Sequence, residues 1–292
     1  MKPWLHLARI SNLPTVWTNV TAAWLLAGGG LADARLYWLI LAGSLLYTGG
    51  MILNDAADVK FDREHRQERP IPSGQVSVLA AWSVGMMMLV LGAGLSIGLG
   101  ANVLGTAALV AAILFYDLYH KHWAGSVIVM GSCRMFLYLM VGSVLLPPDH
   151  AGGAGWLHEK VLPYAVVMFC YVVGITFAAR LEHKDGKLAV VSWILSFALL
   201  GAPLIAVALI SHGQRGDGLD FFIIGPFVWC LMAAFRHLDA GGPAIGKAVG
   251  ILLAGIVIVD ALAICTVSMP LALAFVALAP LLRLWQRWVA AT

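Results

Sequence analysis

The chain has 292 residues, of which 61% are hydrophobic and 11% are charged, and its mean hydropathy is +0.88. Because soluble domains are only roughly 45–50% apolar, this composition excludes a soluble globular protein and predicts an all-α, polytopic membrane helical bundle. The formal net charge of +3 is small and no basic run carries interleaved aromatic residues, so the sequence predicts a protein of the lipid bilayer with no nucleic-acid partner.

The apolar segments predict nine to ten transmembrane helices, because a bilayer core of about 30 Å requires about 20 apolar residues per helix. In chain order the predicted spans are 13–30, 36–53, 76–98, 101–119, 125–146, 162–181, 188–210, 220–238, 244–266 and 269–286. We expect them to form a single integral-membrane domain over residues 1–292. The four cysteines lie inside apolar runs without paired spacing, and they predict neither a disulfide framework nor a zinc site.

The basic residues predict how the chain is oriented. If the N-terminus lies in the cytoplasm, only Arg35, Lys160 and Arg215 fall outside, Arg134 lies within a span, and every other Lys and Arg falls inside. This distribution follows the positive-inside rule. We therefore expect a multi-pass protein of the cell (inner) membrane with a cytoplasmic N-terminus, whereas nothing in the pattern predicts an oligomeric state.

The loop between the second and third spans is the most highly charged part of the chain, NDAADVKFDREHRQERPIPSG over residues 54–74. Its first half offers Asn54, Asp55, Asp58 and Asp62, which share one face if the preceding helix continues through them. Clustered carboxylates repel each other unless a cation lies among them, and Mg²⁺ prefers oxygen ligands. These four residues therefore predict a magnesium site.

The second half of this loop is basic. Arg63, Arg66 and Arg69 carry planar guanidinium groups that suit phosphate oxygens, and the Pro-Ile-Pro-Ser-Gly run at 70–74 must end any helix. Acidic residues, then basic residues, then a turn predict a magnesium-diphosphate site. The alternative is a solvated charged loop between two hydrophobic segments.

A second polar cluster, Tyr116, Asp117 and Lys121, ends the fourth span. We expect Lys121 to bind phosphate as a point charge, whereas Tyr116 and Asp117 face either substrate or the neighbouring helices.

Two charged residues lie deeper in the predicted membrane region. Arg134 falls within the fifth span, where a charge is costly unless it is paired or faces a wet cavity. Asp260 in the ninth span is a candidate partner. Asn12 and Asn19, at the start of the first span, share a helical face and either extend this polar lining or form hydrogen bonds between helices.

The loop after the sixth span holds Glu182 and Asp185, which are three residues apart and so share a helical face. They predict either a second metal site or a base that acts on a second substrate. A short charged loop at a helix end is the alternative.

The sequence NDAADVKFD at 54–62, followed by RPIPSG at 69–74, resembles the NDxxDxxxD signature and trailing RPxPSG of the UbiA superfamily of intramembrane prenyltransferases. The Tyr116-to-Lys121 segment is similar to the tyrosine-to-lysine element of that family. The loop with Glu182 and Asp185 departs from its second aspartate motif. The phrases SNLPTVWTN and CRMFLYLMVG resemble the EboC-like branch of the superfamily.

This resemblance implies a central cavity capped by two acidic loops that hold Mg²⁺ around a pyrophosphate. It also implies ionisation of a prenyl diphosphate donor and capture of the carbocation by an acceptor that the sequence does not identify. The catalytic residues are then expected to be Asp58, Asp62, Asp185 and Glu182. The metal ligands are expected to be Asn54, Asp55, Asp58, Asp62, Glu182 and Asp185, and the substrate-binding residues to be Arg66, Arg69, Lys121, Asn54, Tyr116 and Arg134.

Two alternatives stay open at this point. One is an intramembrane terpene cyclase, which directs the carbocation back onto its own chain. The other is a protein that binds or moves a prenyl lipid without breaking it.

Overall fold

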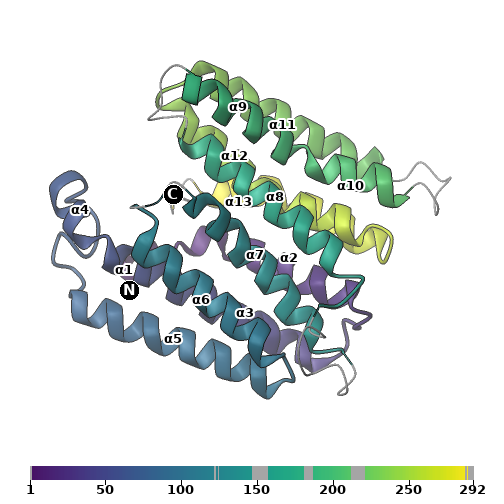
Figure 1. The fold of residues 1–292 in the computed structure, drawn as a ribbon, viewed down its shortest axis with the longest axis horizontal. Coiled ribbons are helices and arrows are strands. Elements are labelled where there is room, and N and C mark those ends of the chain that lie inside the picture. Colours follow the sequence, from purple (N-terminus) through teal and green to yellow (C-terminus); the bar gives the residue numbers. More distant parts are fainter. Residues whose placement is uncertain are drawn as a thin grey trace.

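The computed structural model describes residues 2–121, 123, 125–146, 157–180, 187–211, 221–286 and 288. These residues form helices and no strands (Figure 1). In chain order the helices are α1 (Lys2–Leu7), the 3₁₀ turn η1 (Ile10–Asn12), α2 (Leu13–Leu26), α3 (Ala34–Ala57), α4 (Val59–His65), α5 (Val78–Gly98), α6 (Val103–Tyr119), α7 (Ser126–Ser143), α8 (Leu162–Ala179), α9 (Lys187–Leu200), α10 (Ala202–Ser211), α11 (Phe221–Ala240), α12 (Ala244–Ile264) and α13 (Met269–Trp285).

Each predicted span corresponds to one helix except the seventh, which was predicted as a single helix over 188–210. The structure divides it into α9 and α10, which meet at Gly201. Pro203 lies in the first turn of α10, where a proline is tolerated because the N–H groups of that turn have no partner within the helix. The same missing N–H prevents the hydrogen bond that would continue α9, so the helix is interrupted.

Six described helices are long and apolar enough to cross a membrane, namely α3, α5, α7, α8, α11 and α12. On α5, large apolar side chains such as Leu79, Met87 and Val90 lie exposed, as expected where a helix faces lipid. The chain is therefore an integral membrane protein with an all-helical fold. The predicted crossings are confirmed by length and composition for these six helices, and the total of nine to ten stays a prediction.

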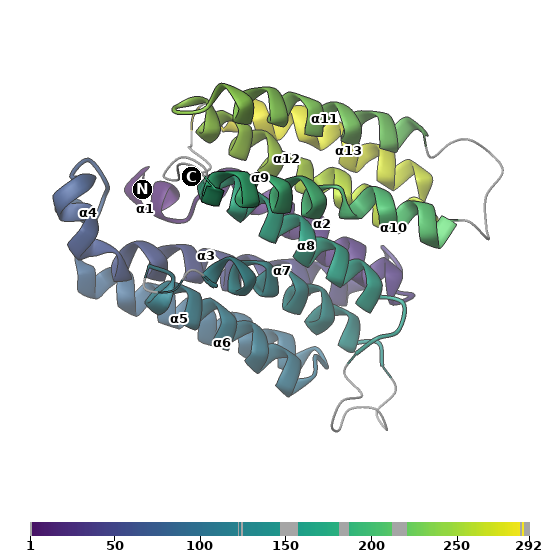
Figure 2. The same ribbon diagram turned by 45° about the horizontal axis from the view of Figure 1, so that its top comes forward.

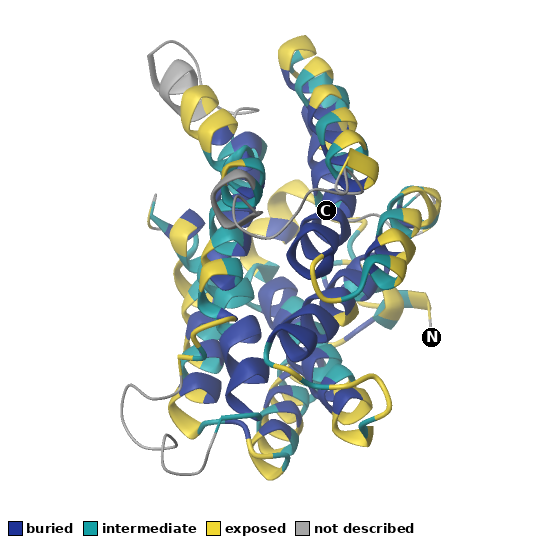
Figure 3. Ribbon diagram, turned by 90° about the vertical axis from the view of Figure 1, so that its right-hand side faces the viewer, coloured by how far each residue is buried: buried dark blue, intermediate teal, exposed yellow. Residues whose placement is uncertain are grey.

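Helix α12 lies in the interior of the bundle. In its most apolar stretch of 18 residues 83% of the residues are buried, compared with 22% in the corresponding stretch of α5. Helix α12 packs against α2, α8, α11 and α13. Buried residues concentrate in the middle of the molecule and exposed residues lie on its outer helices (Figure 3). A helix that is apolar on every face is expected in this interior position.

The ends of several helices meet on one side of the bundle. Because α5 reverses the direction of α3 and α6 reverses it again, the C-terminal ends of α3 and α6 lie together. Figure 2 shows α4 and the N-terminal α1 at this same end. The loop after α4 is anchored there by Ile71, which is 4% exposed and packs with Leu7 of α1 and Ile52 of α3. The folded loop thus brings the charged residues of 54–74 back over the end of α3.

Candidate active site

The acidic half of the loop lies where α3 ends and α4 begins. Asp58 joins the two helices, since its N–H donates to the Asn54 carbonyl at 3.0 Å and its own carbonyl accepts from the Asp62 N–H at 3.0 Å. Asn54, Asp55 and Asp62 are buried, and Asp62 is only 1% exposed. The alternative of a solvated charged loop therefore does not describe these three residues.

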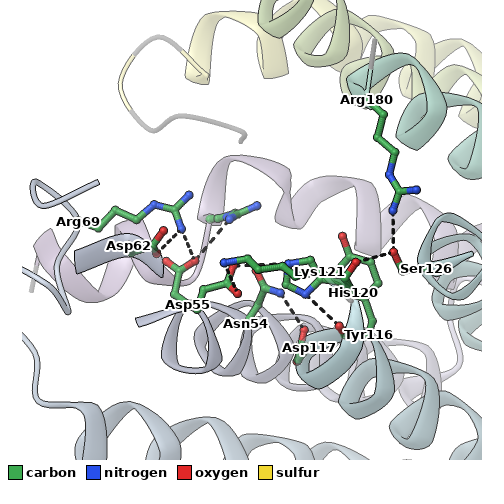
Figure 4. Close-up of polar contacts among 12 residues, drawn as sticks. Asn54, Asp55, Asp62, Arg69, Tyr116, Asp117, His120, Lys121, Ser126 and Arg180 are labelled. Carbon is green, nitrogen blue, oxygen red and sulfur yellow. Dashed lines mark hydrogen bonds and ion pairs between the residues drawn. The ribbon is translucent and has the colours of Figure 1, made fainter. Parts of the chain in front are cut away.

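Two of the carboxylates share Arg69. The Nη1 atom of Arg69 lies 3.1 Å from Asp55 Oδ1 and 2.8 Å from Asp62 Oδ2 (Figure 4). Arg9 also contacts the Asp55 carboxylate, with its Nη2 atom 3.5 Å from Asp55 Oδ1. These guanidinium groups balance two acidic side chains that are largely shielded from water.

The third carboxylate, Asp58, faces the end of α6. Lys121 Nζ lies 2.7 Å from Asp58 Oδ1, and His120 Nε2 lies 3.6 Å from Asp58 Oδ2. Burial by itself raises the pKa of Asp58, but hydrogen bonds from His120 and Lys121 outweigh it, so this pKa lies below its ordinary value. Lys121 Nζ also lies 3.9 Å from the ring centroid of Phe61. Asp58 is therefore held as a carboxylate beside a fixed cation.

Asn54 connects the acidic loop to a cavity inside the bundle. Its side-chain amide donates to Asp117 Oδ1 at 3.2 Å, and Asp117 lines a cavity of about 320 Å³ between α2, α3, α6, α7, α8 and α12. Tyr116 lines the same cavity and stacks on His120 at a centroid distance of 4.9 Å. Most lining residues are apolar, and the charged ones are Arg9, Asp117 and Arg134. Two of these charged residues also contact the acidic loop, since Arg9 pairs with Asp55 and Asp117 accepts from Asn54, so the loop adjoins one end of the cavity without lining it.

The predicted magnesium ligands do not form one compact cluster. Within the residues that the structure describes, no three His, Cys, Asp or Glu side chains are grouped closely enough to hold a metal ion. Asp55 and Asp62 lie on one side around Arg69, and Asp58 lies on the other beside Lys121. The sequence analysis placed the four side chains on one face only if the preceding helix continues through them, whereas α3 ends at Ala57 and α4 begins at Val59.

The donor atoms nevertheless suit Mg²⁺. Among the described residues, Asp62 Oδ1 and Asp117 Oδ2 are buried and have no hydrogen-bond partner, so each carboxylate has an oxygen that no described donor uses. Carboxylate oxygens are the ligands that this ion prefers. The assignment of Asn54, Asp55, Asp58 and Asp62 as magnesium ligands stays a prediction, and Asp117 is a further carboxylate beside Asn54.

Arg9 is a site residue that the sequence analysis did not identify. It lies between α1 and η1 with φ 42°, the only positive φ of a non-glycine residue in the described part of the chain. This left-handed conformation costs about 1–2 kcal/mol for a residue with a Cβ, and it is found here where the side chain contacts Asp55 and lines the cavity. Its partner is 46 residues away, so no local pattern could have indicated the contact.

The other predicted residues fall into two groups. Arg66 caps α4 and is exposed, and it is not among the residues that line the cavity, so its role in phosphate binding stays a prediction. Glu182 and Asp185 lie outside the described residues, and the proposed second metal site stays a prediction with them.

Comparison with known proteins identifies the family of the chain. The sequence model of the UbiA prenyltransferase family matches residues 15–191. The 4-hydroxybenzoate octaprenyltransferase of Pectobacterium carotovorum subsp. carotovorum is 33% identical over 249 residues, which are 79% of this chain and 84% of that one. The digeranylgeranylglyceryl phosphate synthase of Methanopyrus kandleri is 27% identical over 243 residues, 72% of this chain and 88% of that one. The corresponding synthase of Sulfolobus acidocaldarius is 24% identical, and the match covers 65% of its length, slightly less than two thirds.

Solved structures show the same fold. A UbiA homologue from Aeropyrum pernix K1 superposes with a TM-score of 0.67 and 17% identity, over 87% of this chain and 97% of that chain. A UbiA homologue from Archaeoglobus fulgidus, bound to GPP and Mg²⁺, gives a TM-score of 0.63 and 13% identity, over 95% and 99% of the two chains. Since the family model covers more than half of the sequence and the fold agrees, the chain belongs to the UbiA prenyltransferase family.

Proposed function

We propose that this protein transfers an isoprenyl group from a prenyl diphosphate to an acceptor within the membrane, with Mg²⁺ as cofactor. The observation that carries the proposal is the position of the buried acidic loop. It contacts Arg9 and Asp117, which line an apolar cavity, and it is flanked by Arg9, Arg69 and Lys121. The names of the relatives support it, since they are an octaprenyltransferase and digeranylgeranylglyceryl phosphate synthases, and one structural relative holds GPP and Mg²⁺.

The site would separate a diphosphate from its hydrocarbon tail. Arg9, Arg69 and Lys121 offer cationic donors for the diphosphate oxygens, and Asn54, Asp55, Asp58 and Asp62 would hold the metal. When bound, Mg²⁺ neutralises the negative charge that develops on the departing pyrophosphate. Cationic groups fixed in advance at the point where charge develops are the most effective form of such stabilisation.

The reaction then balances as an alkyl transfer. The bond between the allylic carbon and the diphosphate oxygen breaks, and its electron pair leaves with pyrophosphate. The apolar cavity, lined by residues such as Leu109, Ile113 and Leu137, keeps water from the allylic cation. A nucleophilic atom of the acceptor forms the new bond to the allylic carbon and loses its proton.

Pyrophosphate release by membranes that contain the protein tests this proposal. Membranes containing the protein are incubated with prenyl diphosphates of several chain lengths, with Mg²⁺ or with EDTA. We expect Mg²⁺-dependent release that EDTA abolishes and that falls by about 10²–10³ in Asp58→Asn, the loss typical for removing one charge-stabilising group. Glu64→Gln is the matched control, because Glu64 is an exposed carboxylate of the same α4 segment.

The alternatives give different results in the same assay. Binding of the diphosphate without release would contradict the proposal and favour a lipid carrier. Release with cyclised products in the absence of any acceptor would contradict the transfer step and favour a terpene cyclase.

A further inference from the structure

Asp117 is the carboxylate of the site that faces the cavity. It lies two residues before the end of α6 and is 4% exposed. Of the four acidic side chains of the site, which are Asp55, Asp58, Asp62 and Asp117, it is the one that lines the cavity. The sequence left open whether it faces a substrate or the neighbouring helices. The fold turns it toward the cavity, where a ligand can reach it.

One oxygen of the Asp117 carboxylate is held in place and the other is not. Oδ1 accepts a hydrogen bond from the side-chain amide of Asn54 at 3.2 Å. Oδ2 is buried and has no hydrogen-bond partner among the described residues. A buried polar atom without a partner destabilises the fold, and the more so when it carries charge. The bond to Asn54 therefore fixes a carboxylate whose second oxygen is open to a ligand.

The charge of Asp117 is also not neutralised by a direct ion pair. Each of the other three carboxylates pairs with a basic side chain, either Arg69 or Lys121. In the part of the chain that the structure describes, no Lys, Arg or His nitrogen lies within 4.0 Å of the Asp117 carboxylate. Arg9 attracts it from a greater distance, and the neighbouring carboxylates repel it. A bound cation would supply the missing positive charge.

We propose that Asp117 is a ligand of Mg²⁺, which it binds through Oδ2 with Asn54 beside it. This inference rests on the proposed transfer reaction for the identity of the ion, and it adds a ligand from α6 that lies outside the acidic loop. Mg²⁺ is commonly bound through only one or two carboxylates, while water and substrate phosphate complete its octahedron. A compact group of three acidic side chains, which the described residues lack, is therefore not required.

The position of Asp117 gives this ligand a particular task. Lys121 follows Asp117 by four residues, so Asp117 lies about one helical turn deeper in the bundle. It thus lies between the basic side chains and the apolar lining of the cavity. A cation held at this boundary suits the part of a prenyl diphosphate where the charged group meets the hydrocarbon tail, because negative charge develops there as the bond breaks.

Binding of Mn²⁺ in the absence of turnover tests the inference. The purified protein in detergent is titrated with Mn²⁺, which shares the octahedral oxygen coordination of Mg²⁺, and electron paramagnetic resonance reports the free ion. The titration is repeated with inorganic pyrophosphate, with protein-free pyrophosphate as the blank. We expect the Mn²⁺ affinity of Asp117→Asn to fall at least about tenfold, since even supporting groups of a metal site are typically worth about tenfold to a hundredfold.

Two further variants complete this experiment. Asp117→Glu keeps a carboxylate and should recover part of the lost affinity. Asp239→Asn is the matched control, because Asp239 is an exposed carboxylate of α11 that does not line the cavity, and its Mn²⁺ affinity should equal that of the wild type.

Thermal unfolding separates a metal ligand from a purely structural carboxylate. In EDTA we expect Asp117→Asn to be at least as stable as the wild type, because a neutral amide can keep the bond to Asn54 and removes a buried charge without an ion pair. With Mg²⁺ the wild type should gain stability through binding, and the variant should gain less. A structural role predicts the opposite pattern, a variant that is less stable in EDTA and responds to Mg²⁺ like the wild type.

Two results would overturn the inference. One is equal Mn²⁺ affinity in Asp117→Asn and the wild type, and the other is the structural pattern in thermal unfolding. A wild type that binds Mn²⁺ through Asp117 but releases no pyrophosphate from prenyl diphosphates would instead contradict the proposed function and leave this ligand in place.

Discussion

Arg69 is the basic side chain shared by two buried carboxylates of the acidic loop. It lies 3.1 Å from Asp55 and 2.8 Å from Asp62, and Asp62 is 1% exposed. Removing one partner of a buried ion pair leaves an uncompensated charge, which typically costs about 3–5 kcal/mol. Arg69 therefore stabilises the folded loop in addition to the phosphate-binding role proposed for it.

We predict that Arg69→Gln lowers the free energy of unfolding by about 2–4 kcal/mol in EDTA, somewhat less than the full value because Arg69 keeps partial contact with water. Added Mg²⁺ should raise the melting temperature of this variant more than that of the wild type, since the ion neutralises the same carboxylates. Thermal unfolding followed by tryptophan fluorescence in detergent measures both effects. The control is Arg63→Gln, a neighbouring exposed arginine of α4, and equal Mg²⁺ shifts in Arg69→Gln and wild type would show that the metal binds elsewhere.

At the scale of the helices, the close packing of α3 against α5 positions the acidic loop. A Cβ atom added at Gly92 of α5 would lie 2.9 Å from the Ala42 carbonyl oxygen and 3.1 Å from the Leu46 nitrogen of α3. Both are backbone atoms, so the helices themselves would have to move. Because Asn54 and Asp55 lie in the last turns of α3, such a movement would reach the site.

The substitution Gly92→Ala should destabilise the protein by about 1–3 kcal/mol through overpacking and should lower pyrophosphate release. Gly94→Ala on the same helix is the control, because a Cβ there meets nothing within 4 Å. An alanine at that position should be neutral or slightly stabilising, by up to about 1 kcal/mol, through its higher helix propensity. Equal behaviour of the two variants in thermal unfolding would refute the importance of this helix contact.

At the scale of the whole molecule, the buried polar network joins distant parts of the bundle. Asn19 of α2 bonds to Arg134 of α7 and to Asp260 of α12. These hydrogen bonds tie three helices together beside the cavity, and Asn19 and Asp260 are fully buried. Polar groups in such a position stabilise one arrangement of the helices, because any other would leave them unpaired.

The orientation of the molecule in the membrane is a further prediction at this scale. The acidic loop and the N-terminus lie at one end of the bundle, and the connection between α2 and α3 lies at the other. In a variant whose four native cysteines are replaced by alanine, a membrane-impermeant maleimide should label Ala32→Cys in intact cells and label Glu64→Cys only after lysis. Both positions are exposed in the structure, and the opposite labelling pattern would reverse the proposed cytoplasmic placement of the site.

Hydropathy and local spacing were sufficient to predict much of the architecture and the motif. The helical membrane fold and the positions of the spans could be predicted because apolar segments of about 20 residues suit a bilayer whatever they pack against. The acidic-basic loop could be predicted because its residues are contiguous in the sequence. Local spacing was insufficient at Asp58, where one helix ends and the next begins, and at Gly201, where the seventh span is divided.

The partners of the charged residues were decided only by the tertiary structure. Arg9 meets Asp55 across 46 residues, Asn54 meets Asp117 across 63, and Asn19 meets Asp260 across 241. Each contact depends on how far one helix is rotated and shifted against another, which the apolar pattern of a helix buried on most faces does not encode. The sequence thus determined which chemical groups the protein carries, and the packing of the helices determined which of them face one another around the cavity.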